Sequence, residues 1–234
     1  AKDYHLNSCL EDSFIEELCQ EFFLNWLLSL LGEKENILEL GYGDGVVTKH
    51  LYEKKFNITV IEGSSLLVKK AKKLHPKLNC INTLFEDFNP KIKYNTILCL
   101  HILEHVDNPI ELLKHLSKYL KKSGRIIIAV PNSESIHRQL ALIMNLHDSL
   151  ETLSPRDLVV GHQRVYSHQT LIKDISKAGF EEVYFKGFFL KVLPNSMMIE
   201  FSKELIFALN QISDKLPNEL CATLVSIVKL DKKL

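Results

Sequence analysis

The chain has 234 residues, with 29 lysine and arginine residues against 29 aspartate and glutamate residues, so its formal net charge is zero. This length fits one α/β domain over 1–234 with a modest insertion, and the neutral balance provides no basic field for nucleic acid. The five cysteines lack the C-x-x-C spacing of zinc sites, and no apolar run reaches the roughly 18 residues of a membrane-spanning helix. We therefore expect a cytoplasmic protein with no nucleic-acid partner, no metal and no transmembrane segment.

Strand and helix patterns alternate along the chain. Apolar residues at helical spacing over 10–31 predict an amphipathic helix before the first strand. Short apolar strands separated by helices are typical of a parallel sheet covered on both faces. The expected strands are 36–40, 58–62, 78–82, 96–100, 125–130, 181–190 and 220–230. The expected helices that follow the first are 46–54, 65–74, 110–120, 136–150 and 197–209. The fold class is thus a doubly wound α/β fold with a seven-stranded, mostly parallel sheet.

Residues 131–168 interrupt this alternation after the fifth strand. An insertion there lies at the carboxyl edge of a parallel sheet, which is where ligands bind in open α/β folds. We expect this insertion to form part of an acceptor pocket or its lid.

Three glycines at alternate positions, Gly41, Gly43 and Gly45, follow the first strand. Glycines at a strand-to-helix turn let a ligand lie directly against the main chain. A dinucleotide fingerprint needs a small residue where Val46 stands, and Asp44 would repel a pyrophosphate. Glu62 ends the second strand, where an acid can accept hydrogen bonds from a ribose diol. The pattern therefore predicts a nucleoside ligand without a phosphate.

Four ordered segments, 37–45, 60–64, 94–106 and 120–132, resemble the class I S-adenosylmethionine-dependent methyltransferases. Within that superfamily the chain is most similar to the small-molecule group that includes the ubiquinone-biosynthesis O-methyltransferases. A weaker similarity continues over 161–167 and 178–180. Tyr42 stands where the family has a small residue, and we expect it to change only the outer surface of the loop. Asn95 replaces an aspartate, at the strand entrance far from the cofactor.

The resemblance implies a Rossmann-like methyltransferase fold, whose last strand inserts antiparallel, and S-adenosyl-L-methionine (SAM) as the cofactor. Some of these residues also have structural interpretations: Glu39 as an acceptor for loop N–H groups, Ser64 as a helix N-cap and Phe85 as a core residue. The residues expected to contact the cofactor are Glu39, Gly41, Tyr42, Gly43, Gly45, Glu62, Gly63, Ser64, Leu84, Phe85, Glu86, Leu100 and His101.

Histidines are the candidate catalytic residues. His101 and His105 follow the fourth strand, and His162 lies in the insertion; a histidine can deprotonate a hydroxyl as a general base. His105 has a structural interpretation as a hydrogen-bonding residue at a helix start. Together with Glu104, His101 and His105 could also hold a divalent metal alongside the acceptor hydroxyls.

His162, Arg164 and Tyr166 alternate along the insertion. If this segment is extended, all three side chains share one side. Facing the pocket, they would supply a base, a cation for an anionic acceptor and a hydroxyl; the alternative is a surface strand with ordinary polar residues.

The expected function is methyl transfer from SAM to a small-molecule hydroxyl, with a sugar or surface-glycan precursor as one candidate acceptor. The alternatives are N-methylation, methylation of a quinone precursor, and a non-catalytic domain that binds SAM as a partner or sensor. Whether the chain forms a homodimer stays open.

Overall fold

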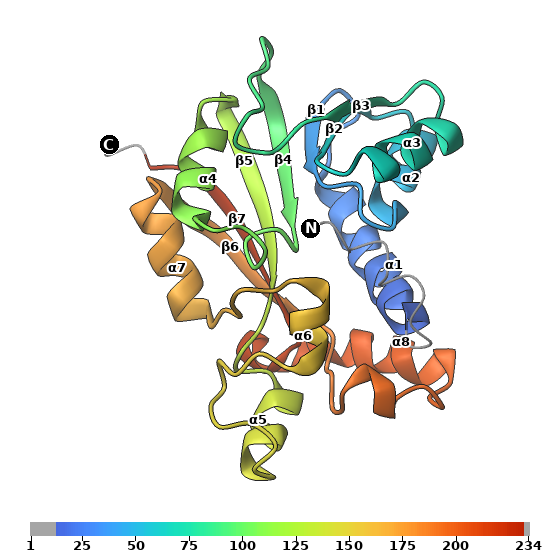
Figure 1. Ribbon diagram of the computed structural model, residues 1–234, viewed down its shortest axis with the longest axis vertical. Coiled ribbons are helices and arrows are strands. Elements are labelled where there is room, and N and C mark those ends of the chain that lie inside the picture. The colour runs from blue at the N-terminus through green and yellow to red at the C-terminus, as the bar shows by residue number, and fades with distance from the viewer. Residues whose placement is uncertain (1–12, 232–234) are drawn as a thin grey trace.

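A seven-stranded sheet runs through the middle of the protein, and helices cover both of its faces (Figure 1). The computed structural model describes residues 13–231. The strands are β1 (Asn36–Leu40), β2 (Asn57–Glu62), β3 (Asn79–Asn82), β4 (Tyr94–Leu100), β5 (Leu120–Pro131), β6 (Phe180–Phe188) and β7 (Thr223–Leu230). The helices are α1 (Ser13–Leu30), α2 (Val46–Glu53), α3 (Ser65–Leu74), α4 (Pro109–Ser117), α5 (Ile136–Ile143), α6 (Pro155–Val160), α7 (His168–Lys177) and α8 (Lys203–Ile212).

The strand order is β3-β2-β1-β4-β5-β7-β6. Strands β1 to β5 pair in parallel, whereas β7 is antiparallel to both β5 and β6. The expected fold class and the antiparallel insertion of the last strand are therefore confirmed. None of the helices over 13–231 has the length and apolar character needed to cross a membrane.

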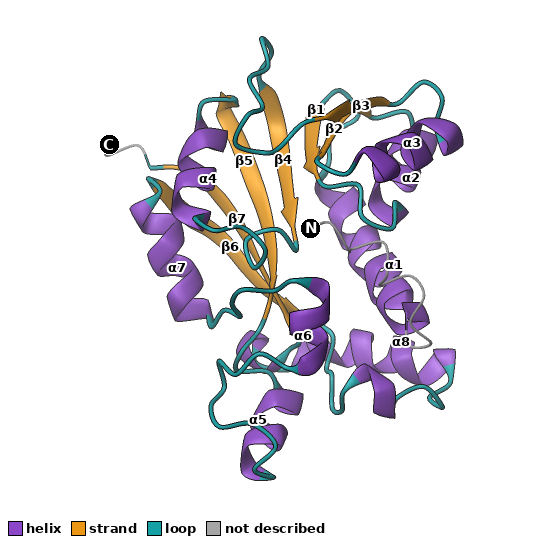
Figure 2. Ribbon diagram, viewed as in Figure 1, coloured by secondary structure: helices purple, strands orange, loops and turns teal. Residues whose placement is uncertain are grey.

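The sheet separates two hydrophobic cores, because successive side chains of a strand point to opposite faces. In β4, Ile97 and Cys99 pack in the core that includes α4 and α7, while Leu98 packs in the core that includes α1, α2 and α3. Figure 2 shows these two helical layers on either side of the strands. This alternate burial, with both faces covered, holds the carboxyl ends of β1, β2 and β4 in fixed positions.

Several predicted boundaries are wrong for identifiable reasons. Strand β5 begins at Leu120, which pairs with Tyr94 ahead of an irregularity in the register, so the helix expected over 110–120 ends at Ser117. Helix α5 ends at Ile143 and not near residue 150, because Asn145 adopts a left-handed conformation with φ of 57°. Residues 10–12 of the first predicted helix lie outside the described residues.

Two helices were not predicted, and one was misplaced. The missed helices, α6 and α7, each begin with a capping box, at Ser154 and Ser167. The helix expected over 197–209 begins at Lys203, after the cap residue Ser202. The cap residues were the sequence signals that could have located all three helices.

Candidate active site

The carboxyl ends of β1, β2 and β4 form one edge of the sheet. Strand β1 pairs in parallel with β2 on one side and with β4 on the other. Chain order reverses at β1, which makes this edge a topological switch point, the position where open α/β sheets bind ligands. The predicted glycine loop, Glu62 and His101 follow these three strands directly.

The glycine loop needs residues without side chains. Gly41, Gly43 and Gly45 have φ values of 76°, 52° and 84°, in the left-handed region that side chains disfavour. Gly41 N–H donates to the Ile61 carbonyl oxygen over 2.8 Å, which ties the loop to β2. A Cβ atom at Gly41 would lie 3.3 Å from Cδ1 of Ile102. The segment after β4 therefore packs directly against the glycine loop.

Tyr42 lies inside the loop and not on its outer surface, so that prediction is wrong. Its side chain is only 3% exposed and packs in the core with α1, α2 and α3. A Cβ atom on Gly45 would lie 2.5 Å from the Tyr42 ring. The tyrosine thus occupies the space that a larger residue at position 45 would need.

Glu39 is a buried carboxyl group within β1. Its Oε2 accepts a hydrogen bond of 2.8 Å from the Thr48 hydroxyl on α2. Among the described residues this hydroxyl is its hydrogen-bond partner, so the expected role as an acceptor for loop N–H groups is wrong. Burial raises the pKa of Glu39 to about 8, although the Thr48 hydrogen bond opposes the shift.

Glu62 holds the glycine loop and the start of α3 together. Its Oε2 accepts from Tyr42 N–H over 2.9 Å, and its Oε1 accepts from Ser64 N–H over 2.7 Å. Each carboxylate oxygen has two lone pairs, so both oxygens keep capacity for a ligand hydroxyl. Ser64 also has its predicted structural role, since its side chain accepts from Leu67 N–H at the N-cap of α3.

The segment after β3 lies beside Gly63. A Cβ atom at Gly63 would lie 3.3 Å from Cδ2 of Leu84, which is 59% exposed. Leu84 and Glu86 also border a cavity of about 620 Å³ that reaches the start of α4. Phe85 packs against the core with α4 and α7, as its structural interpretation expected. Sequence reasoning missed Asn82, whose amide donates to the carbonyl oxygens of Glu62 and Gly63 and so fixes this turn.

His101 directly follows β4 with an unusual backbone. Its φ is 54°, a conformation in which histidine is tolerated better than most residues. Its Nδ1 lies 3.1 Å from Oε1 of the fully buried Glu104, while 48% of its own side chain is exposed. Burial lowers the pKa of His101, but the hydrogen bond and charge of Glu104 outweigh it and leave the pKa above its ordinary value.

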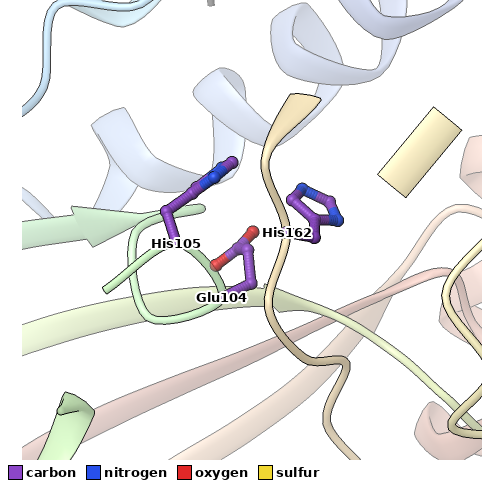
Figure 3. Close-up of side chains that lie close together, drawn as sticks. All are labelled: Glu104, His105 and His162. Atoms are coloured by element: carbon purple, nitrogen blue, oxygen red, sulfur yellow. The ribbon is translucent and has the colours of Figure 1, made fainter. Parts of the chain in front are cut away.

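The other two predicted histidines meet at Glu104. The rings of His105 and His162 lie 4.7 Å apart, and Figure 3 shows the Glu104 carboxylate beside both of them. His105 Nδ1 lies 3.2 Å from the Gly161 carbonyl oxygen, so its expected structural hydrogen bond is present. The residue lies in a turn and not at a helix start, because α4 begins only at Pro109. Burial lowers the pKa of His105, against the opposing charge of Glu104. The structure thus brings all three candidate histidines to one carboxylate.

The insertion is held by a buried ion pair that sequence reasoning missed. Arg138 donates to Oδ2 of Asp157 over 2.6 Å, and the other carboxylate oxygen of Asp157 lies 2.8 Å from Nδ1 of His162. Ser154 also donates to Asp157. These contacts keep the pKa of Asp157 well below its usual range, although burial alone would raise it.

Arg164 and Tyr166 do not have the roles expected of a pocket-facing strand. The Arg164 guanidinium donates to the carbonyl oxygens of Leu103, Val106 and Asp107, so it fastens the insertion to the loop after β4. Tyr166 is 2% exposed and donates to Asp174 on α7. Both residues therefore have structural roles. The alternative interpretation, a surface strand with ordinary polar residues, is also wrong for Tyr166, because its side chain is buried.

The fold and this edge define the class: an α/β protein whose glycine loop and strand-end acid suit a nucleoside ligand without a phosphate. A sequence family described as "Methyltransferase domain" matches residues 12–184. The chain belongs to this family, and its methyl donor is SAM. The residues present fit that cofactor, because Glu62 keeps acceptor capacity beside a loop whose three glycines carry no side chains of their own.

Curated relatives of this chain carry the name ubiquinone biosynthesis O-methyltransferase. The protein of Rickettsia akari (strain Hartford) is 26% identical over 139 residues, which cover 53% of this chain and 55% of the relative. The mitochondrial protein of Schizosaccharomyces pombe is 23% identical over 120 residues, which cover 48% of this chain and 44% of the relative. The chain therefore spans about half the length of the curated relatives it matches.

Solved structures share the fold. A SAM-dependent methyltransferase from Archaeoglobus fulgidus has a TM-score of 0.59 at 20% identity, covering 88% of this chain and 90% of that chain. A SAM-dependent methyltransferase from Mesorhizobium loti has a TM-score of 0.62 at 14% identity, covering 87% of this chain and 95% of that chain. The plantazolicin methyltransferase BamL, solved with a triazolic desmethylPZN analog and SAH, has a TM-score of 0.62 at 17% identity, covering 97% of this chain and 90% of that chain.

Proposed function

We propose that the chain transfers the methyl group of SAM to a hydroxyl group of a small-molecule acceptor. The observation that carries this proposal is the position of His101. Its backbone continues from β4, next to a segment that packs on the glycine loop, and Glu104 holds its Nδ1. A partly exposed histidine in this place, oriented by a carboxylate, is suited to remove the proton of an acceptor hydroxyl.

The cofactor residues have distinct roles in the proposal. Gly41, Gly43 and Gly45 leave room for the methionine part against the main chain, beside Glu39. Glu62 accepts from the ribose hydroxyls with the lone pairs that the loop N–H groups do not use. Leu84 and Glu86 border the adenine. When bound, SAM supplies a methyl group that its positive sulfonium makes electrophilic.

His101 acts as the base, in preference to His105 and His162. Its Nδ1–H donates to Glu104, which leaves the Nε2 lone pair for the acceptor proton. The remaining work of the protein is to align the two reactants and to exclude water, which is catalysis by proximity.

The surface of the insertion supports an apolar acceptor, such as a quinone precursor, over a sugar. It carries large apolar side chains in contact with solvent: Ile143, Met144, Leu146, Leu158 and Val159, which are between 60% and 76% exposed. Such a surface on the insertion suits an acceptor with an apolar ring or chain. The names of the curated relatives agree with this class of acceptor.

An acceptor panel tests the proposal. The protein is incubated with SAM carrying a labelled methyl group and one of three acceptors: an alkyl-substituted catechol, a monosaccharide or the matching aniline. We expect labelled product from the catechol, with the gain of one methyl group by mass spectrometry. Product from the aniline alone would establish N-methylation, and bound SAM without any product would support the non-catalytic alternative.

The first prediction concerns Glu62. Replacing Glu62 with alanine removes a charged acceptor for two hydroxyls, so SAM affinity should fall by about 30- to 150-fold, or roughly 2–3 kcal/mol. Titration calorimetry measures the change. Glu181→Ala, an exposed acid on β6, is the matched control and should bind like the wild type. Unchanged affinity in Glu62→Ala would refute the ribose role.

The second prediction concerns the insertion as a lid. Because water must leave the transfer site, amide hydrogen exchange over 131–168 should slow when cofactor and acceptor bind together. Helix α7, which packs on the sheet, serves as the internal reference and should exchange at the same rate throughout. Full protection of 131–168 in the empty protein would show that the insertion is scaffold.

A further inference from the structure

We infer that Lys191 is the binding point for an anionic group, such as a carboxylate, of the methyl acceptor. The sequence led us to expect this cation from Arg164, but Arg164 fastens the insertion to the loop after β4. Lys191 lies shortly beyond Phe188, the last residue of β6. The inference rests on the proposed function, because it assigns the anion to the acceptor of the methyl group.

Strand direction places Lys191 at the ligand edge of the sheet. Both β5 and β6 are antiparallel to β7, so they run in the same direction, and β6 ends at the edge where β4 and β5 end. Lys191 N–H donates to the Phe189 carbonyl oxygen over 2.9 Å. Phe189 and Val192, which flank Lys191, pack in one cluster with Ile15 on α1. The segment that carries Lys191 is therefore fixed between the end of β6 and α1.

The acids around Lys191 are already bound by other groups. The charges of Glu16 and Asp157 both act on its ammonium group. Glu16 accepts from Arg156 over 2.7 Å and from the Asn195 amide over 3.3 Å, and Asp157 belongs to the buried ion pair of the insertion. Within residues 13–231, no carboxylate forms an ion pair with Lys191. Its positive charge is thus available to a ligand.

An anionic ligand would stabilise this charge. Lys191 is partly buried, and burial lowers its pKa, although the charge of Glu16 opposes the shift. Lysine is rarely withdrawn from water without a partner, because desolvation disfavours its charged form. A carboxylate in contact with the ammonium group offsets that cost through a charge-assisted hydrogen bond.

Glu16 connects this region to the transfer site. Burial lowers the pKa of His101 and Glu104 raises it, and the negative charge of Glu16 adds to the rise. Glu16 therefore lies within electrostatic range of both His101 and Lys191. Asn195, which binds Glu16, has a buried Oδ1 with no hydrogen-bond partner among the described residues, so a ligand hydroxyl can donate there. An acceptor held between these groups can present a hydroxyl to His101 and its anion to Lys191.

A comparison of protocatechuate, a catechol with a carboxylate, and its neutral amide tests the site. Calorimetry measures the binding of each compound to protein saturated with demethylated SAM. We expect the wild type to bind the acid about 10- to 100-fold more tightly than the amide, as for one charge-assisted hydrogen bond. Lys191→Met should remove this preference without weakening amide binding, whereas Lys191→Arg should keep most of it. Lys186→Met is the matched control, because Lys186 on β6 already pairs with Asp214 over 2.6 Å.

Thermal unfolding separates a ligand role from a structural one. Because Lys191→Met removes a desolvated charge that has no ion-pair partner in the described structure, its melting temperature should not fall below that of the wild type. A marked fall would assign Lys191 to the fold and overturn the inference. A preference for the acid that survives in folded Lys191→Met would also overturn it, as would a wild type that binds both compounds equally or binds neither.

Turnover of the same two compounds tests the proposed function separately. Acid binding that depends on Lys191 but gives no methylated product would establish the anion site and refute hydroxyl methylation of this acceptor. Methylation of both compounds, bound with equal affinity, would do the reverse.

Discussion

Replacing His101 with asparagine should lower turnover of a weakly acidic hydroxyl acceptor by about 100- to 10,000-fold while SAM affinity stays near that of the wild type. Loss of a general base removes a rate factor of this size. Asparagine tolerates the left-handed backbone at this position and keeps an N–H group that can donate to Glu104. Steady-state kinetics and calorimetry measure the two quantities separately.

The acidity of the acceptor separates base catalysis from a structural effect. A nitro-substituted phenol that is already ionised at neutral pH needs no base, so His101→Asn should methylate it at nearly the wild-type rate. His168→Gln, on α7, is the matched control and should leave both reactions unchanged. If His101→Asn slows the two acceptors equally, His101 positions the acceptor and does not take its proton. If it slows neither, the chemistry is proximity alone.

Replacing Gly45 with alanine should lower the free energy of unfolding by about 2–5 kcal/mol. A side chain in the left-handed conformation costs roughly 1–2 kcal/mol, and forcing a packed neighbour to move costs about 1–3 kcal/mol. Both costs apply at Gly45, because its φ is 84° and the new Cβ atom would lie 2.5 Å from the Tyr42 ring. Because the loop is the SAM site of the proposal, SAM affinity should fall with stability. Urea unfolding and calorimetry measure both effects.

A double-mutant cycle isolates the part due to Tyr42. In a Tyr42→Ala background the ring is gone, so Gly45→Ala should then cost only the backbone share of about 1–2 kcal/mol. Gly32→Ala is the matched control, because the added Cβ atom would lie no closer than 3.4 Å to its nearest neighbour, the Glu35 side chain, and the Gly32 backbone is not in the left-handed region. Equal costs of Gly45→Ala in the two backgrounds would show that Tyr42 does not restrict the loop.

Periodic patterns explain why much of the fold could be predicted. Strand β4 is buried on both faces, so its sequence is a run of mostly apolar residues that predicts a strand. The three glycines indicate the turn into α2. Glu62 could be located because it is the polar end of such a run. Parallel order then brings the ends of β1, β2 and β4 together without any knowledge of side-chain contacts.

Contacts between distant segments could not be predicted in this way. His105 meets Gly161 across 56 residues, and the sequence pattern does not specify which way the insertion folds over the loop after β4. The Arg138–Asp157 pair joins two short helices whose relative orientation depends on tertiary packing. Tyr42 was misjudged for the same reason, because a loop has no period that tells the inner side from the outer side.

The most direct test of the central claim is a single turnover with trideuteriomethyl SAM, excess wild-type protein and an alkyl-substituted catechol. Nuclear magnetic resonance of the isolated product identifies the atom that carries the label. We expect the trideuteriomethyl group on a hydroxyl oxygen of the catechol, with demethylated SAM formed in equal amount. Label found wholly on the unreacted donor, while calorimetry shows that this donor is bound, would contradict the account.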